Sequence, residues 1–238
     1  SRKAESLSPG SLEAHRARGF VLEYTANYEE AVSEFNAAIA LNPNIADLYL
    51  ALGRNYFYLQ NYNDAITEYS RANALNPKDS QPESLIARAY AINGDYQKAI
   101  QYGLEAIADA PTDPYLYGNI GLVYSSATQY LDAIDNLRLA IRGGLSADGQ
   151  PINGLPMADG KIAQYYYTYG LALAREGQCS EALQISQAIQ SGLRNNDVAV
   201  YNAEEMVNIC SRLSKEGKSD VEVTQPPTGE TPTPEVTP

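Results

Sequence analysis

The chain has 238 residues, enough for one or two domains, and its net charge of −12 argues against a nucleic-acid binder, which needs a basic face. One histidine and two cysteines provide no zinc-ligand spacing and no adequate catalytic triad, so we expect no metal, no cofactor, no catalytic residue and no enzyme. No apolar run approaches the roughly 18 residues that cross a bilayer, so we expect no membrane span in this chain.

Residues recur along the chain with a period of 34. Prolines, small residues, tyrosines and alanines keep this spacing in fixed order: Pro9, Pro43, Pro77 and Pro111; Gly19, Gly53, Ala87 and Gly121; Tyr28, Tyr62, Tyr96 and Tyr130; Ala31, Ala65, Ala99 and Ala133. Such a period indicates a stack of structurally equivalent units.

Each period contains two helical patterns separated by a short break. In the second unit, apolar residues fall at steps of three and four over 48–59 and again over 65–75. Asn61 precedes the second pattern as a candidate N-cap, and in the fourth unit Asp113 precedes Pro114, a helix start signal. The recurring small residues fit positions where two helices touch closely. We therefore expect each unit to be a helix–turn–helix.

The second unit resembles the tetratricopeptide repeat (TPR) family, whose unit is a 34-residue helix–turn–helix, in the order and spacing of Leu52, Gly53, Tyr56, Ala65, Tyr69, Ala72 and Pro77. The resemblance covers five units, 12–45, 46–79, 80–113, 114–147 and 163–196. It implies an all-α fold, a right-handed α-solenoid of five TPR units plus a C-terminal capping helix.

Four stretches depart from this repeat, and the TPR domain is expected to span 12–218. Residues 1–11 match the end of an upstream repeat, which predicts a fragment of a longer array. The Gly/Pro/Asp-rich insertion 143–160 is either a tolerated surface loop or a flap beside the groove. A single helix over 197–214 is expected to cap the array. The acidic, Pro/Thr-rich segment 219–238 is expected to be disordered.

In the TPR family the first helix of each unit lines a concave groove. Mapping by register assigns to this surface Arg16, Phe20, Tyr24, Arg54, Phe57, Tyr58, Arg88, Ile92, Tyr115, Asn119, Leu122, Tyr167, Leu171 and Arg175. We call these residues the inner face. Arginines and aromatic rings on one wall of an acidic protein favour an extended protein or peptide partner that is acidic or rich in proline and aromatic residues. The alternative is that the arginines are scattered and merely solvated.

Some TPR domains bind a C-terminal carboxylate through a Lys/Asn/Arg clamp, and this chain does not match that clamp. Arg16 can supply one cation, but Phe20, Ala51, Gln81 and Leu85 occupy the other clamp positions. The resemblance implies a non-enzymatic protein–protein interaction scaffold that binds in its concave groove. The alternatives are a structural or assembly protein of the cell envelope that uses convex or end surfaces, and a regulatory module of a larger protein.

The two cysteines are expected to lie side by side. Cys179 starts the second helix of the fifth unit and Cys210 lies near the end of the capping helix, and consecutive helices run antiparallel. A disulfide would staple the cap, whereas two buried unlinked thiols are the alternative. An oxidised bridge favours an extracytoplasmic or cell-envelope location in a bacterium, with the cytoplasm as the alternative.

Two further expectations concern single features. His15 replaces an aromatic residue of the repeat and is expected to be an imperfect packing residue. The tail carries five prolines and four acids, which complement the inner-face arginines and predict weak self-association by exchange between molecules. The alternative is a flexible linker to another segment.

Overall fold

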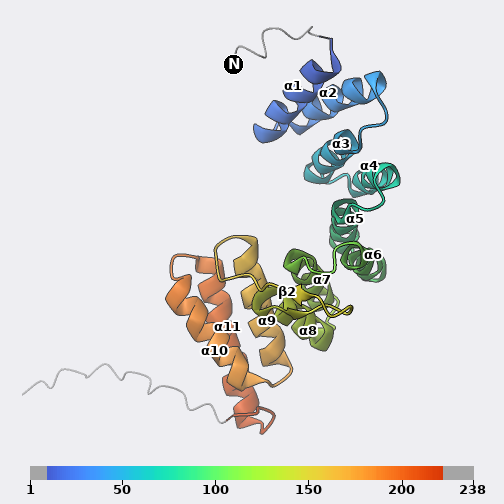
Figure 1. Ribbon diagram of the computed structural model, residues 1–238. Coiled ribbons are helices and arrows are strands. Elements are labelled where there is room, and N and C mark those ends of the chain that lie inside the picture. Colours follow the sequence, from blue (N-terminus) through green and yellow to red (C-terminus); the bar gives the residue numbers. More distant parts are fainter. Residues whose placement is uncertain (1–9, 222–238) are drawn as a thin grey trace, which may run out of the picture. The chain divides into compact units, whose positions relative to one another are not determined.

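The computed structural model describes residues 10–221 and divides into two compact units, 1–156 and 157–238 (Figure 1). Residues 1–9 and 222–238 lie outside the described part of the chain. Nearly all of the predicted truncated repeat, and all but the first three residues of the predicted tail, therefore lie there too.

The N-terminal unit is built from helix pairs that follow the 34-residue period (Figure 1). Its helices are α1 (Leu12–Tyr24), α2 (Tyr28–Leu41), α3 (Ala46–Tyr58), α4 (Tyr62–Leu75), α5 (Ser80–Ile92), α6 (Tyr96–Asp109), α7 (Pro114–Ser126) and α8 (Tyr130–Arg142). The two helices of each pair pack together, and each pair packs on the next one. The predicted all-α repeat is confirmed.

Close helix contact explains the recurring small residue. A Cβ atom on Gly53 of α3 would lie 2.5 Å from the ring of Tyr69 in α4, and one on Gly121 of α7 would lie 2.6 Å from Leu137 in α8. These distances are far below van der Waals contact, so a larger residue would force each pair apart.

The two predicted N-caps have different outcomes. The Asp113 carboxylate accepts a hydrogen bond from Tyr115 N at 2.9 Å and caps α7, as predicted. Asn61 makes no side-chain cap of α4, so that prediction is wrong. Its backbone carbonyl instead accepts the first helical hydrogen bond, from Ala65 N at 3.0 Å.

The turn inside each helix pair requires a left-handed residue. Its φ is +59° at Ala26, +63° at Gln60 and +59° at Thr128, whereas glycine occupies the equivalent positions 94 and 177. A β-branched residue is strained in this region because its Cβ crowds the backbone.

We expect Thr128→Gly to raise the free energy of unfolding by about 0.5–1 kcal/mol, because it removes this strain. Urea unfolding followed by circular dichroism measures the change. Gly94→Ala, the reverse exchange at the same register, should lower the stability by a similar amount. A Thr128→Gly variant that is less stable than the parent would contradict the assignment.

The insertion after α8 contains a small hairpin, which the sequence did not predict. Strands β1 (Gly144–Leu145) and β2 (Pro151–Ile152) pair antiparallel. Ile152 is buried, and Leu155 N donates to the Ala140 carbonyl of α8 at 2.9 Å. Burial, together with the nearby Asp148 carboxylate, raises the pKa of Tyr117. These contacts favour a folded surface insertion over a flap, because Tyr117 lies about 200° around α7 from the inner-face residue Tyr115.

The C-terminal unit consists of α9 (Lys161–Arg175), α10 (Cys179–Gly192) and α11 (Asp197–Lys215), and each of these helices packs against the other two. Helix α9 begins two residues before the predicted unit 163–196, and α11 coincides with the predicted capping helix. Met206 of α11 is buried against α9, where a Cβ on Gly170 would lie 2.5 Å from its sulfur. Val198 and Tyr201 of α11 are exposed.

Candidate functional site

The inner-face residues of the N-terminal unit lie on the first helix of each pair, as the register predicted. Phe20, Tyr24, Tyr58, Arg88, Ile92 and Tyr115 are exposed, and Arg16, Arg54, Phe57, Asn119 and Leu122 are partly buried. Tyr167, Leu171 and Arg175 share one side of α9 in the C-terminal unit, at steps of four residues. We restrict the candidate groove to the N-terminal unit, whose helices α1, α3, α5 and α7 form its wall.

Contacts between successive first helices join these residues into one surface. The Arg88 guanidinium of α5 lies 4.5 Å from the ring centroid of Phe57 in α3. Asn119 of α7 donates through Nδ2 to the Ser84 hydroxyl of α5 at 3.1 Å. Each contact links equivalent helices of neighbouring repeats, so the wall is continuous from one repeat to the next.

Arg54 is neutralised within the wall. Its guanidinium donates to both carboxylate oxygens of Glu23 in α1, at 2.8 and 3.2 Å, and both side chains are largely buried. A bidentate pair of this kind holds the arginine in place and uses most of its donors. Glu23 was not among the predicted site residues, although it lies 31 residues before Arg54, which is one repeat of 34 less about one helical turn.

Arg16 is also partnered, through a longer and more exposed contact of 3.5 Å with Asp47. Arg88 differs, because it forms no ion pair with any carboxylate in the described part of the chain. It is exposed and lies over an aromatic ring, an arrangement that leaves its donors available. Of the three inner-face arginines in this unit, Arg88 is the one positioned to meet an acidic ligand.

Aromatic rings gather at the end of α3. Tyr58 stacks on Tyr28 with ring centroids 4.9 Å apart, and Phe57 meets Tyr62 edge to face at 5.4 Å. Beneath them, burial strongly raises the pKa of Tyr69, although the positive charges of Arg54 and Arg88 act in the opposite direction. The Tyr69 hydroxyl therefore stays neutral, and it adds no charge beside the Arg54–Glu23 pair.

His15 is a hydrogen-bonding residue, contrary to the expectation of an imperfect packing residue. Its Nδ1 lies 2.6 Å from Glu34 Oε2, and Arg18 Nε donates to Glu34 Oε1 at 3.0 Å. The chain replaces the usual aromatic and leucine of this register with a polar cluster that satisfies its own hydrogen bonds.

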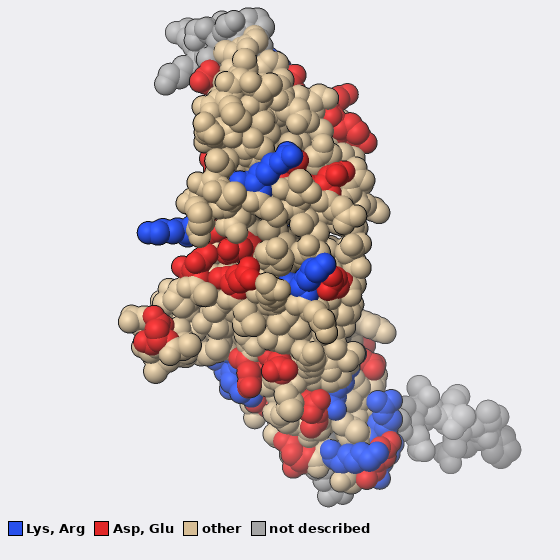
Figure 2. All heavy atoms as spheres, turned by 90° about the vertical axis from the view of Figure 1, so that its right-hand side faces the viewer, with Lys and Arg blue, Asp and Glu red and all other residues tan. Residues whose placement is uncertain are grey.

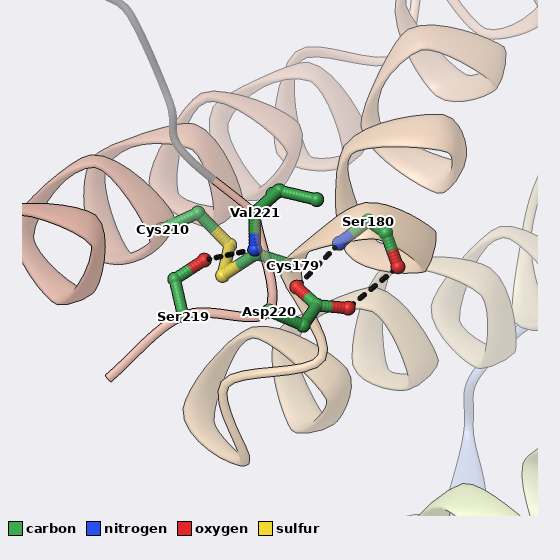
Figure 3. The surroundings of a disulfide bond; sticks show 6 residues. All are labelled: Cys179, Ser180, Cys210, Ser219, Asp220 and Val221. Atoms are coloured by element: carbon green, nitrogen blue, oxygen red, sulfur yellow. Dashed lines mark hydrogen bonds between the residues drawn. A yellow bond between two sulfur atoms is a disulfide. The ribbon is translucent and has the colours of Figure 1, made fainter. Parts of the chain in front are cut away.

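The structure joins Cys179 and Cys210 in a disulfide, with the Cα atoms 5.5 Å apart and both side chains fully buried (Figure 3). Cys179 is the first residue of α10 and Cys210 lies in the last third of α11, as the antiparallel arrangement predicted. The positions of the two cysteines agree with the predicted disulfide, and their oxidation state distinguishes it from the alternative of two buried unlinked thiols.

The chain after α11 folds back to cap α10 beside this disulfide (Figure 3). The Asp220 carboxylate accepts hydrogen bonds from Ser180 N at 2.9 Å and Ser180 Oγ at 2.6 Å, and Asp220 N donates to the Gly177 carbonyl at 3.1 Å. Burial opposes ionisation of Asp220, but these hydrogen bonds outweigh it and lower its pKa. Residues 219–221 thus belong to the folded C-terminal unit, although the sequence predicted that the tail begins at 219.

We expect Asp220→Ala to destabilise the C-terminal unit by about 1 kcal/mol, the usual cost of removing a helix cap. Because the pKa of Asp220 is lower in the folded state, this contribution is present at neutral pH and is lost as the pH falls below about 4. Urea unfolding at pH 7 and pH 3 measures both effects. Glu216→Ala, in the same segment but outside this cap, is the control, and an equal loss in both variants would contradict the cap.

The described residues contain no group of three His, Cys, Asp or Glu side chains that could hold a metal ion. Across the same part of the chain, every helix is too short or too polar to span a membrane.

Comparison with known proteins agrees with this architecture. Residues 12–45 and 50–114 match two family models described as tetratricopeptide repeat. No curated protein sequence matches the chain significantly.

Solved structures of similar fold include MamA from Desulfovibrio magneticus RS-1 (TM-score 0.61, 16% identity, 78% of this chain and 97% of that chain). Another is PilF from Pseudomonas aeruginosa (TM-score 0.65, 16% identity, 86% of each chain). A third is YrrB, described as a TPR protein with an unusual peptide-binding site (TM-score 0.55, 18% identity, 76% of this chain and 93% of that chain). The matched segments, the 34-residue register and the helix pairs together identify residues 12–45 and 50–114 as tetratricopeptide repeats, and the solved structures share the fold of the chain.

Proposed function

We propose that the inner face of the N-terminal unit binds an extended segment of a protein partner. The observation that carries this proposal is the row of exposed apolar side chains on successive first helices, Phe20, Tyr58, Ile92 and Tyr115, with the unpaired Arg88 among them. Exposed apolar residues scattered singly need no explanation, but a row along one wall favours a binding surface. The peptide-binding site described for YrrB, a structure of the same fold, supports this use of the fold.

The charges of the inner face narrow the partner's chemistry. Glu23 and Asp47 offset Arg54 and Arg16, so the wall presents far less positive charge than its arginines alone would supply. We therefore expect a segment held mainly by proline or aromatic contacts, with one acidic residue placed to meet Arg88. A strongly acidic ligand is disfavoured, because the whole chain carries a charge of −12.

Selection of short random peptides on the protein tests this proposal. Selected peptides should be enriched in proline and aromatic residues, and Arg88→Glu or Phe57→Ala should weaken their binding by about tenfold or more. Fluorescence anisotropy with labelled peptides measures the affinities. Arg194→Glu, an exposed arginine in the loop before α11 whose side chain contacts a single backbone carbonyl, is the charge-matched control. Equal weakening in both arginine variants would argue against a site at the inner face.

We propose further that residues 222–238 compete weakly for the inner face of another molecule. Their prolines match the ligand chemistry above, whereas their three glutamates exceed the one acidic residue expected to meet Arg88, which is why the competition is proposed to be weak. Truncation should follow Val221, because the preceding residues cap α10. Removing 222–238 should raise the apparent affinity for a selected peptide. Identical isotherms over a range of protein concentrations would remove this proposal.

A second candidate function is assembly through the end of the array. Val198 and Tyr201 of α11 are 59% and 68% exposed on the cap, which leaves an apolar spot where a polar surface is expected. Light scattering of the wild type and a Tyr201→Ser variant separates the candidates. A concentration-dependent oligomer that the substitution abolishes would favour assembly.

We propose an oxidising location, such as a bacterial cell envelope, because Cys179 and Cys210 lie together as a buried pair that can form a disulfide. Mass spectrometry of the native protein without reductant tests it. Two free, alkylatable thiols would favour the cytoplasm instead.

A further inference from the structure

One repeat interface is polar where its neighbours are apolar. Ile39 and Tyr49 pack in one cluster between α2 and α3. One period later, between α4 and α5, the equivalent residues are Asn73 and Glu83. In the following repeat, between α6 and α7, the equivalent residues are Ile107 and Tyr117. The polar pair therefore occurs at the α4–α5 interface and at neither of the two neighbouring interfaces.

Glu83 of this pair is buried, Asn73 is partly buried, and the two side chains satisfy only part of each other's hydrogen-bonding capacity. Asn73 donates through Nδ2 to Glu83 Oε1 at 3.1 Å, and Glu83 is 7% exposed. Glu83 Oε2 and Asn73 Oδ1 are both buried, and no N–H or hydroxyl group in the described part of the chain donates to them. Protonated Glu83 shares its proton with Asp109, but once Glu83 is ionised both oxygens are buried acceptors without a donor, which is unfavourable unless a partner donates to them.

Further carboxylates border this pair. Asp109 and Glu105, in the last turns of α6, are exposed and lie close enough to Glu83 to act on its titration. Burial is the largest of the causes that raise the pKa of Glu83 to about 7, and Asp109 and Glu105 add to it. No lysine or arginine among the described residues pairs with any of these carboxylates. The charged groups of the cluster are therefore all carboxylates; Asn73 Nδ2 is already engaged by Glu83, and Gln101 Nε2 donates to Glu105 Oε1 at 2.9 Å.

We propose that this cluster, Asn73, Glu83, Glu105 and Asp109, is an acidic pocket that binds an arginine side chain of a partner protein. A guanidinium carries five N–H donors in a planar fork, which suits two buried oxygens flanked by carboxylates. A metal ion fits less well, because the described residues provide no group of three ligating side chains close enough to hold one.

The acidic pocket is separate from the inner face. Glu83 precedes Arg88 by five residues, which is about 140° around α5 at 100° per residue. Figure 2 shows acidic side chains gathered over the middle of the face that carries α4 and α6. A partner that fills both sites would thus contact two sides of the third repeat.

N-ethylguanidinium, titrated into the full chain and followed by amide chemical shifts, tests the acidic pocket. At about pH 8, saturable shifts are expected at amides around Asn73, Glu83 and Asp109. At about pH 5.5 Glu83 holds a proton, which should weaken binding by about tenfold or more. The double variant Asn73→Ile/Glu83→Tyr restores the apolar pair of the neighbouring repeats and should lose the shifts while remaining folded.

Glu83→Gln provides a second variant of nearly unchanged size. It should weaken binding about tenfold, as expected for loss of a charge-assisted hydrogen bond. Arg88→Glu should leave the titration unchanged, which separates this pocket from the inner face. Shifts that persist in both pocket variants, that arise equally with sodium at the same concentration, or that do not arise at all would overturn the proposal.

Discussion

Replacing both cysteines by alanine is expected to lower the free energy of unfolding of the C-terminal unit by about 3–4 kcal/mol. The disulfide closes a loop across a sequence separation of 31, and it restricts the unfolded chain far more than the folded one. It also fixes the start of α10 to the end of α11, so the cap of the array is most affected.

Hydrogen exchange of the α11 amides measures this change directly, because it reports the stability of this unit alone. Reductant should destabilise the wild type by a similar amount. It should not change the stability of the Cys179→Ala/Cys210→Ala variant, which is the control. Equal protection of α11 with and without reductant in the wild type would contradict a stabilising disulfide.

The stability of the N-terminal unit is expected to fall as the pH rises from about 4.5 to 7. Glu83 has a pKa of about 7 in the folded protein, above its ordinary value, so the folded state binds its proton more tightly. The stabilisation is complete below the ordinary pKa and is lost as the pH passes the raised one. A shift of this size corresponds to at most about 3 kcal/mol.

Comparing the wild type with the Asn73→Ile/Glu83→Tyr variant separates the contribution of Glu83 ionisation from the repulsion among the other acidic groups, which both proteins share. The variant should be more stable than the wild type at pH 8, and the difference should largely vanish near pH 4. Urea midpoints across this range give the curve. A difference that does not vary with pH would mean that Glu83 ionises normally and that the pair is merely poorly packed.

The repeating part of the structure was predictable because it depends on local pattern. Three of these features act within a single repeat: the apolar spacing, the small residue at Gly53 and the Asp113 cap. They can therefore be predicted from the sequence. The disulfide followed from one additional rule, that successive helices run antiparallel. Because the chain has only two cysteines, only one pairing is possible.

The features that escaped prediction depend on contacts outside that pattern. Arg54 looked available for a ligand because its partner, Glu23, belongs to the preceding repeat. The α10 cap comes from Asp220, 40 residues after the serine it binds. The hairpin at 144–152 lies in an insertion that no other repeat contains, so no register was available to align it.

Mapping a selected peptide onto the protein by amide chemical shifts shows whether the inner face is the surface that binds it. Binding there should perturb amides along α3 and α5, centred on Phe57 and Arg88, and the same peptide should fail to perturb them in Arg88→Glu. Perturbations confined to α4 and α6, or to Val198 and Tyr201 of α11, would contradict it and place the binding surface elsewhere on the repeats.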